Sequence, residues 1–245
     1  MAYQPEPRPT SLRPFFTLWL GQVFSLVGSQ LVQFALIWWL TQETGSATVL
    51  ALASIVGLVP QVVLGPFVGP LVDRWNRRRT MIVADTVVAL ATLVLALLFW
   101  SGTVQVWHVF VILFIRALGG TFHGPAMTAS TSLMVPQEQL TRIQGLNQML
   151  NGGLNIISAP LGALLLALLP IQGILMIDLV TAAVAILTLF VVHVPQPARE
   201  ETHSDAMAQY WHDLRAGLRY VLNWRGLLVL GGLAMLINLV LSPTV

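Results

Sequence analysis

The chain has 245 residues, of which 56% are hydrophobic and only 9% are charged. A water-soluble globular domain carries about 25% charged residues, so most of this surface must face something other than water. All twelve basic residues are arginine and cysteine is absent, which excludes a lysine-dependent phosphate loop, a lysine Schiff base, disulfides and thiolate metal sites.

Seven apolar segments have the length that crosses a bilayer, which takes about 20 residues as a helix. We expect spans over 15–40, 47–72, 80–100, 106–130, 143–169 and 174–194, and a seventh that begins at 226. The polar stretch 195–225 has the periodicity of an amphipathic helix, which is also typical of a generic interfacial anchor. The prediction is an all-α, polytopic membrane bundle: a cytoplasmic N-terminus over 1–14, six spans within 15–194, a cytoplasmic linker over 195–225 and a seventh span over 226–245.

Arginines flank these spans on one side of the membrane only. They precede the first span, follow the sixth, and lie between the second and third and between the fourth and fifth. Because loops rich in arginine stay in the cytoplasm, we expect a plasma or inner membrane protein with its N-terminus inside. The pI near 9.7 then reflects membrane topology, and the expected partner is the lipid bilayer rather than nucleic acid.

The segment between the second and third spans carries the most specific pattern. A glycine is followed four residues later by an aspartate–arginine pair and then by further arginines: Gly69, Asp73, Arg74, Arg77 and Arg78. This pattern resembles the loop signature of the major facilitator superfamily, and the runs at 40–47, 81–85 and 114–126 are similar to its macrolide-efflux branch. The resemblance implies two facing six-helix bundles, each built from two inverted three-helix repeats, with substrate bound between them.

The same resemblance implies a role for this motif and a limit for the chain. The motif is expected to act as a conformational latch, with Asp85 pairing with its arginines; a partnership of Asp85 with Arg116 is the alternative. A full member of the family has about twelve spans, so we expect the second six-helix bundle to be missing here and this chain not to transport alone.

Arg116 is predicted to lie deep in the membrane. Counting about 1.5 Å per residue from Trp107 puts it roughly 14 Å deep, where an arginine is costly unless it faces a wet cavity or a partner. It resembles the arginine of the family's fourth-helix signature, which is associated with proton coupling in drug antiporters. We expect Arg116 either to bias the protonation of a nearby carboxylate or to be a structural cation held by carbonyls and water.

Other polar residues are candidates for the same proton and substrate pathway. Asp178, like Asp85 and Glu43, is a carboxylate that could partner Arg116. It is expected to be a charge that complements the start of the sixth span, with an outer proton acceptor as the alternative. His123 shares a helical face with Arg116 and is interpreted as a packed, hydrogen-bonded histidine or as a proton relay. The inward polar set is sparse, and its members are Gln22, Gln30, Gln33, Asn147, Asn151 and Asn155.

The fifth predicted span contains a run of small residues around a proline: Gly152, Gly153, Pro160 and Gly162. It resembles the antiporter signature of the family, from which it departs by having Ala159 before the proline. Small residues at this spacing also serve helix packing in any membrane bundle.

The features of the sequence predict a polytopic membrane bundle, and the resemblance implies a secondary transporter that exports hydrophobic or amphipathic drugs, macrolides being the specific expectation, in exchange for protons. We expect no enzymatic activity, no cofactor and no metal site. Three alternatives remain open: a facilitator of a sugar, metabolite or siderophore, a seven-span receptor or sensor with its N-terminus outside, and a scaffold that does not transport. The small number of inward polar residues favours an apolar cargo. The arginines indicate a cytoplasmic N-terminus, which argues against a receptor with its N-terminus outside.

Overall fold

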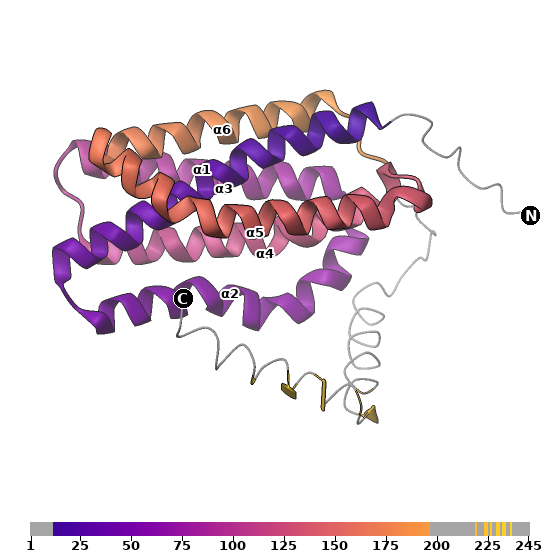
Figure 1. Ribbon diagram of the computed structural model, residues 1–245, viewed down its shortest axis with the longest axis horizontal. Coiled ribbons are helices and arrows are strands. Elements are labelled where there is room, and N and C mark those ends of the chain that lie inside the picture. The colour runs from indigo at the N-terminus through magenta and orange to yellow at the C-terminus, as the bar shows by residue number, and fades with distance from the viewer. Residues whose placement is uncertain are drawn as a thin grey trace, which may run out of the picture. The chain divides into compact units, whose positions relative to one another are not determined.

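The computed structural model describes residues 12–196 and, beyond them, the isolated positions Arg219, Asn223, Trp224, Gly226, Val229, Leu230, Gly232, Leu233 and Leu236. In the continuous part, six helices follow one another (Figure 1): α1 (Arg13–Thr44), α2 (Ala47–Arg74), α3 (Arg77–Trp100), α4 (Val106–Met134), α5 (Gln137–Leu168) and α6 (Ile171–Val191). All six are long and apolar enough to cross a membrane. The prediction of a multi-pass helical membrane bundle is confirmed, whereas the predicted linker helix and seventh span lie outside the described residues, isolated positions apart.

Except between α3 and α4, the connections between the helices are shorter than the sequence suggested. α2 continues to Arg74 and α3 begins at Arg77, so only Trp75 and Asn76 separate them. The side chain of Asn76 accepts a hydrogen bond from the Arg79 N–H at 2.9 Å and caps the first turn of α3. The motif expected in a loop therefore occupies two helix ends. The sequence missed this because hydropathy marks the lipid-facing part of a helix and not its polar end.

α5 shows the same difference at its start. It begins at Gln137 rather than near residue 143, so Arg142 lies in its second turn and not in a loop. At the opposite end of the bundle, Gly45 terminates α1 in the left-handed conformation, with φ of 58°, and its N–H bonds to the Thr41 carbonyl. A glycine adopts this conformation without the steric cost that a side chain brings.

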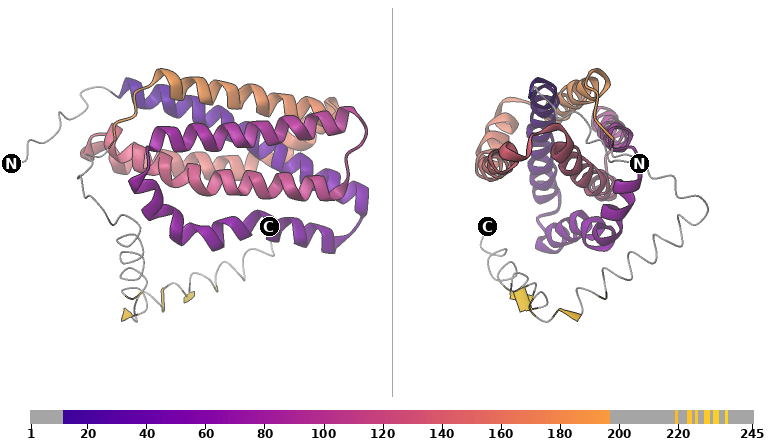
Figure 2. Two further views of the ribbon diagram at one scale, coloured as in Figure 1. Left: turned by 180° about the vertical axis from the view of Figure 1, so that it is seen from behind. Right: turned by 90° about the vertical axis from the view of Figure 1, so that its right-hand side faces the viewer.

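The helices pack as two groups of three, one centred on α1 and the other centred on α4. α1 packs mainly on α6 and α5, α4 packs mainly on α3 and α2, and α3 also packs on α6. This set of neighbours is unchanged when α1, α2 and α3 are exchanged for α4, α5 and α6, and α1 and α4 run in opposite directions. α2 and α6 lie on opposite sides of the bundle in every view (Figure 2). Such an arrangement is the one expected of two inverted three-helix repeats.

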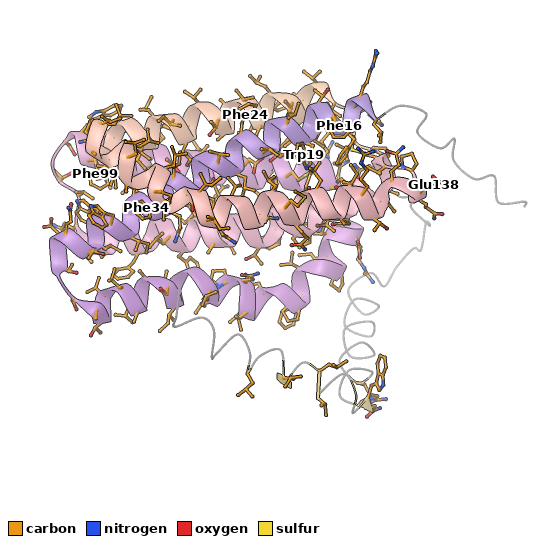
Figure 3. All side chains as sticks on the ribbon, viewed as in Figure 1. Phe16, Trp19, Phe24, Phe34, Phe99 and Glu138 are labelled. Atoms are coloured by element: carbon orange, nitrogen blue, oxygen red, sulfur yellow. The ribbon has the colours of Figure 1, made fainter. Side chains whose placement is uncertain are left out.

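The bundle is apolar outside and polar in the middle of its core. Exposed apolar side chains such as Phe24, which is 57% exposed, cover the helices (Figure 3). Inside, one apolar cluster surrounds Leu36 and Leu95, and a second surrounds Phe15 and Leu189. Buried polar residues lie between these clusters along the helices: Gln22, Thr92, Arg116 and Asp178.

Candidate functional site

A cavity of about 1080 Å³ borders this polar layer. All six residues that the sequence suggested for the proton and substrate pathway line it: Gln30, Gln33, Arg116, His123, Asn151 and Asp178. Polar side chains that the sequence reasoning did not count also line it: Ser25, Ser29, Ser54, Gln61 and Thr121. Its volume lies slightly above the range of small-molecule pockets, roughly 300–1,000 Å³.

Two members of the expected polar set lie elsewhere. Neither Asn147 nor Asn155 lines the cavity. Asn147 instead accepts a hydrogen bond at its Oδ1 from the indole Nε1 of Trp19, at 2.7 Å, and so links α5 to α1. The cavity is nevertheless richer in hydrogen-bonding groups than the sequence indicated, because serines and glutamines of α1 and α2 face it.

Arg116 of α4 and Asp178 of α6 form an ion pair at the wall of the cavity. Arg116 Nη1 lies 2.7 Å from Asp178 Oδ2, and the two side chains are only 7% and 3% exposed. Arg116 also donates to Thr92 Oγ1 at 2.8 Å and to the carbonyl of Ser29 at 3.1 Å. Asp178 accepts further hydrogen bonds from the hydroxyls of Ser29 and Thr92, at 3.2 and 3.3 Å. Four helices thus converge on one hydrogen-bonded pair of opposite charges.

The expectation that Asp178 complements the start of the sixth span is wrong. Asp178 lies two turns into α6, which begins at Ile171, and the effect of a helix dipole fades beyond the first turn. α6 starts earlier than the apolar run suggested, and this places the carboxylate deeper in the bundle. There it is buried and paired with Arg116.

The expected pairing of Asp85 with the arginines of the motif is also wrong. Within the described residues, Asp85 contacts Gln22 Nε2 through Oδ2 and His123 Nε2 through Oδ1, both at 3.5 Å. The contact with His123 lacks the geometry of a hydrogen bond, so that buried nitrogen has no hydrogen-bond partner in the described part of the chain. At Nε2, His123 therefore lacks the hydrogen bond that the sequence suggested for it.

Arg77 and Arg78 of the motif instead contact neighbouring helices. Arg77 Nη1 donates to the carbonyl of Ala129 at 2.8 Å, and its Nη2 lies 3.6 Å from Asp73 Oδ1. Arg78 donates from Nε and Nη2 to the carbonyls of Leu189 and Phe190 in the last turn of α6. These side chains connect the start of α3 to α4 and α6.

Trp75, which lies between α2 and α3, adds a further contact at this end of the bundle. Trp75 stacks on Phe122 of α4, with ring centroids 6.1 Å apart and planes 10° from parallel. Phe122 is the neighbour of His123 in the sequence, so the motif region touches the same stretch of α4 that faces Asp85. Among the described residues, Gly69, the first residue of the motif, has no atom within 4 Å of the position that a Cβ would occupy.

The small residues of α5 divide into two groups. A Cβ on Gly162 would lie 2.5 Å from Phe34 Cδ1, so this glycine permits close packing of α5 on α1 (Figure 3). Gly152 and Gly153 have nothing within 4 Å of that position among the described residues. Pro160 is exposed within the helix. Packing against α1 therefore explains one member of the predicted signature.

Sequence reasoning missed Ser29 and Thr92 as partners of the ion pair. Serine and threonine in apolar helices commonly bond to their own backbone, as Thr121 does with the carbonyl of Ala117, so their identity alone gave no signal. The seven-residue spacing that puts Ser29 on the same face of α1 as Gln22 was the one available clue.

Comparisons with known proteins agree with this architecture. The sequence model of one protein family, the Major Facilitator Superfamily, matches residues 18–245 of the chain. The chain is 42% identical over 182 residues to Macrolide efflux protein A of Streptococcus pyogenes, which is 74% of this chain and 45% of that protein. It is 41% identical over 152 residues to Macrolide efflux protein A of Enterococcus faecalis, covering 62% and 47% of the two chains. It is 24% identical over 243 residues to the Multidrug efflux pump Tap of Mycobacterium bovis BCG, covering 96% and 57%.

The chain thus spans about half the length of the curated relatives that it matches. The family model covers most of the sequence and includes all six described helices from early in α1 onward. Six apolar helices, two three-helix groups and a polar cavity at mid-bundle are the features that this match predicts. The chain belongs to the Major Facilitator Superfamily of membrane transporters.

Proposed function

We propose that this chain supplies one bundle of a secondary transporter that exports hydrophobic or amphipathic drugs, macrolides among them, in exchange for protons. The observation that carries the proposal is the buried Arg116–Asp178 pair at the wall of a cavity of about 1080 Å³. Charged side chains inside membrane segments are rare and generally belong to a transport pathway. The names of the relatives, macrolide and multidrug efflux proteins, support the class of cargo.

The lining of the cavity suits an amphipathic molecule. Gln30, Gln33 and Gln61 offer amide donors and acceptors, while Leu26, Ile37, Leu58, Val88 and Leu113 supply apolar contact. Small-molecule sites combine such apolar walls with a few polar groups that fix orientation. We infer that cargo binds beside the ion pair and that the cavity opens to either face of the membrane in turn.

A second six-helix bundle is the proposed partner across this cavity. The relatives are about twice as long as the chain, and two helices bury little of their apolar surface within the described bundle. Only 11% of the most apolar window of α2 and 6% of that of α5 is buried, against 33% for each of the other four helices. Gly152 and Gly153 of α5 would let the second bundle approach closely. The motif at Asp73 to Arg78 is proposed to latch one of the two states.

The test is drug accumulation in a macrolide-sensitive bacterial host that expresses the complete gene product. We expect less labelled macrolide inside the cells than in cells with the empty vector, and recovery of accumulation when a protonophore collapses the proton gradient. Arg116→Ala should abolish the effect, while Glu43→Gln, an exposed carboxylate at the end of α1, should leave it unchanged. Accumulation equal to that of the empty-vector cells contradicts the proposal.

One observation favours a second class of cargo. The cavity holds more hydroxyl and amide groups than an apolar cargo requires, including Ser25, Ser54 and Gln61. A sugar or other polar metabolite is therefore a candidate, and competition with labelled macrolide separates the two. If a polar solute displaces the macrolide and is itself accumulated or exported, the polar cargo is the physiological one.

Orientation and autonomy follow from the same proposal. We propose that the end of the bundle carrying Arg77 and Arg78 faces the cytoplasm, together with the N-terminus. Reporter fusions before residue 13 and after residue 102 test this. The first reporter must lie in the cytoplasm and the second outside it. We expect cells that express residues 1–245 alone to accumulate drug like cells with the empty vector.

A further inference from the structure

The polar layer contains two carboxylates at matching places in the two three-helix repeats. Asp85 lies eight residues beyond the start of α3 at Arg77, and Asp178 lies seven residues beyond the start of α6 at Ile171. Each begins the same Asp-x-Val-x-Ala run, at 85–89 and at 178–182. The third helix of each repeat thus carries one carboxylate at nearly the same depth, counted from opposite faces of the membrane.

The partners of the two carboxylates match as well. Each carboxylate contacts one residue from the first helix of its own repeat and one from the first helix of the other repeat. On both first helices these partners are seven residues apart, two turns along one face. They are Gln22 and His123 for Asp85, and Arg116 and Ser29 for Asp178. The bundle therefore contains two versions of one site, roughly 10 Å apart along the helices.

The two versions differ in whether their charge can change. Arg116 cannot lose its proton in a protein, and its contact with Asp178 is a short 2.7 Å. An imidazole, unlike a guanidinium, can gain and lose a proton, and both contacts of Asp85 are long, at 3.5 Å. The Asp85 and His123 side chains are also 13% and 22% exposed and line the cavity, whereas that of Asp178 is 3% exposed.

No fixed positive charge in the described bundle is available to Asp85. Of the helices that pack on α3, α4 contributes Arg116 and His123, and α6 contributes Asp178. Arg116 is already paired with Asp178, and α1 faces Asp85 with the neutral Gln22. Apart from Asp85 itself, the charged residues of α2 and α3 lie at the helix ends, where Arg77 and Arg78 bind Asp73 and backbone carbonyls. A proton on Asp85 or on His123 is thus the local way to neutralise this carboxylate.

We propose that Asp85 and His123 form the proton-binding site of the transporter, and that Arg116–Asp178 is its non-titrating counterpart. This inference rests on the proton coupling proposed above. Without a proton the site carries one negative charge, and one proton taken from water makes it neutral, bound at the carboxylate oxygen or at the imidazole nitrogen. Because a net charge is costly away from water in a membrane, the deprotonated site favours a cavity open to water. The protonated site can be enclosed, and the proton returns to water when the cavity opens again.

The test uses the complete gene product in liposomes, with a labelled macrolide as the probe. Two quantities are measured: uptake driven by a pH gradient, and exchange of external labelled for internal unlabelled drug at equal pH. Asp85→Asn should lose uptake driven by the gradient and keep exchange, because exchange needs no net movement of protons. Asp85→Glu, which keeps a titratable group, should recover uptake driven by the gradient relative to Asp85→Asn, and the exposed control Glu43→Gln should keep both activities.

His123→Gln provides a second variant with the carboxylate intact. We expect gradient-driven uptake to persist with a shifted pH dependence, since the histidine no longer shares the proton. An unchanged pH profile in this variant, or gradient-driven uptake in Asp85→Asn equal to that of the wild type, overturns the inference. Loss of both activities in folded Asp85→Asn also overturns it, because the residue then serves cargo binding or structure rather than coupling.

Failure of the proposed function appears in the wild-type protein itself. A wild type that exchanges drug and ignores the pH gradient is not proton-coupled, and a wild type that does neither is not a macrolide transporter. Failure of the present inference is read only from the variants, against a wild type that responds to the gradient. The two failures are therefore distinguishable.

Discussion

Arg116 Nη1 lies 2.7 Å from Asp178 Oδ2, inside a bundle whose outer surface is apolar. The ion pair joins α4 to α6, and Ser29 and Thr92 extend it to α1 and α3. Each charge is compensated by the other, so the layer holds two opposite charges and no net charge from this pair. A pair of this kind is tolerated because it is complete, and removing one member leaves the other unpaired in a medium that solvates it poorly.

Breaking the pair on one side should therefore cost more than removing it. We expect Arg116→Leu to lower the free energy of unfolding by about 3–5 kcal/mol, because Asp178 stays buried without its partner. The double variant Arg116→Leu with Asp178→Leu should recover most of this loss while transport remains absent. Thermal unfolding in detergent, followed by tryptophan fluorescence, measures both. If the double variant is no more stable than the single one, the coupling between the two charges is not the cause.

The glycines of α5 provide a matched test of packing. A Cβ on Gly162 would lie 2.5 Å from Phe34 Cδ1 and 3.3 Å from Phe34 Cβ. Gly162→Ala should therefore destabilise the bundle by about 1–3 kcal/mol through overpacking. Gly152→Ala meets no described atom within 4 Å, and alanine is the better helix former by about 1 kcal/mol, so this variant should be neutral or slightly stabilised. Equal effects on Tm in the two variants would argue against packing on α1.

The architecture was accessible from the sequence because one physical rule dominates it. Crossing a bilayer takes an uninterrupted apolar helix of about 20 residues, and six such helices appear at the expected places. Helix ends were less accessible. The polar first turn of α5, from Gln137, and the arginine start of α3, from Arg77, extend beyond the apolar runs, and hydropathy does not report them.

The site was predictable in its members and not in its pairings. Depth alone singled out Arg116, because a cation at the midplane requires a partner. Which carboxylate would serve depended on the packing of α3, α4 and α6, and neither Asp178 nor Asp85 makes the contacts that its place in the sequence suggested. The matching Asp-x-Val-x-Ala runs mark Asp85 and Asp178 as equivalent positions. This equivalence is recognisable only once α1, α2 and α3 are compared with α4, α5 and α6 as repeats.

The arginines at the start of α3 have separable roles. Arg78 donates two hydrogen bonds to carbonyls in the last turn of α6, where a cation also complements the negative end of the helix dipole. The neighbouring Arg79 side chain is exposed, so it contributes positive charge to this end of the protein. Arg78→Ala should cost about 1–3 kcal/mol of stability, since hydrogen bonds to a charged donor are lost.

Arg79→Ala is the control for that measurement. It removes the same charge from the same helix turn, and its backbone N–H still bonds to Asn76. We expect its Tm to stay close to that of the wild type. A loss of stability as large in Arg79→Ala as in Arg78→Ala would show that charge at this end of the bundle, rather than the contact with α6, stabilises the fold.

The absence of cysteine allows a direct test of whether water reaches the cavity. Single cysteines can be introduced without removing any native one, and maleimides react with the thiolate, which forms readily only in contact with water. Gln33→Cys and Gln61→Cys, from the cavity wall, should react with a membrane-impermeant maleimide when the cavity faces the labelled side. Leu90→Cys should not react, because Leu90 is 57% exposed, lies in the middle of α3 and does not line the cavity, so that lipid covers it. Excess macrolide should slow the labelling of the two cavity positions. Equal labelling of all three positions would mean that the polar side chains do not line an aqueous path.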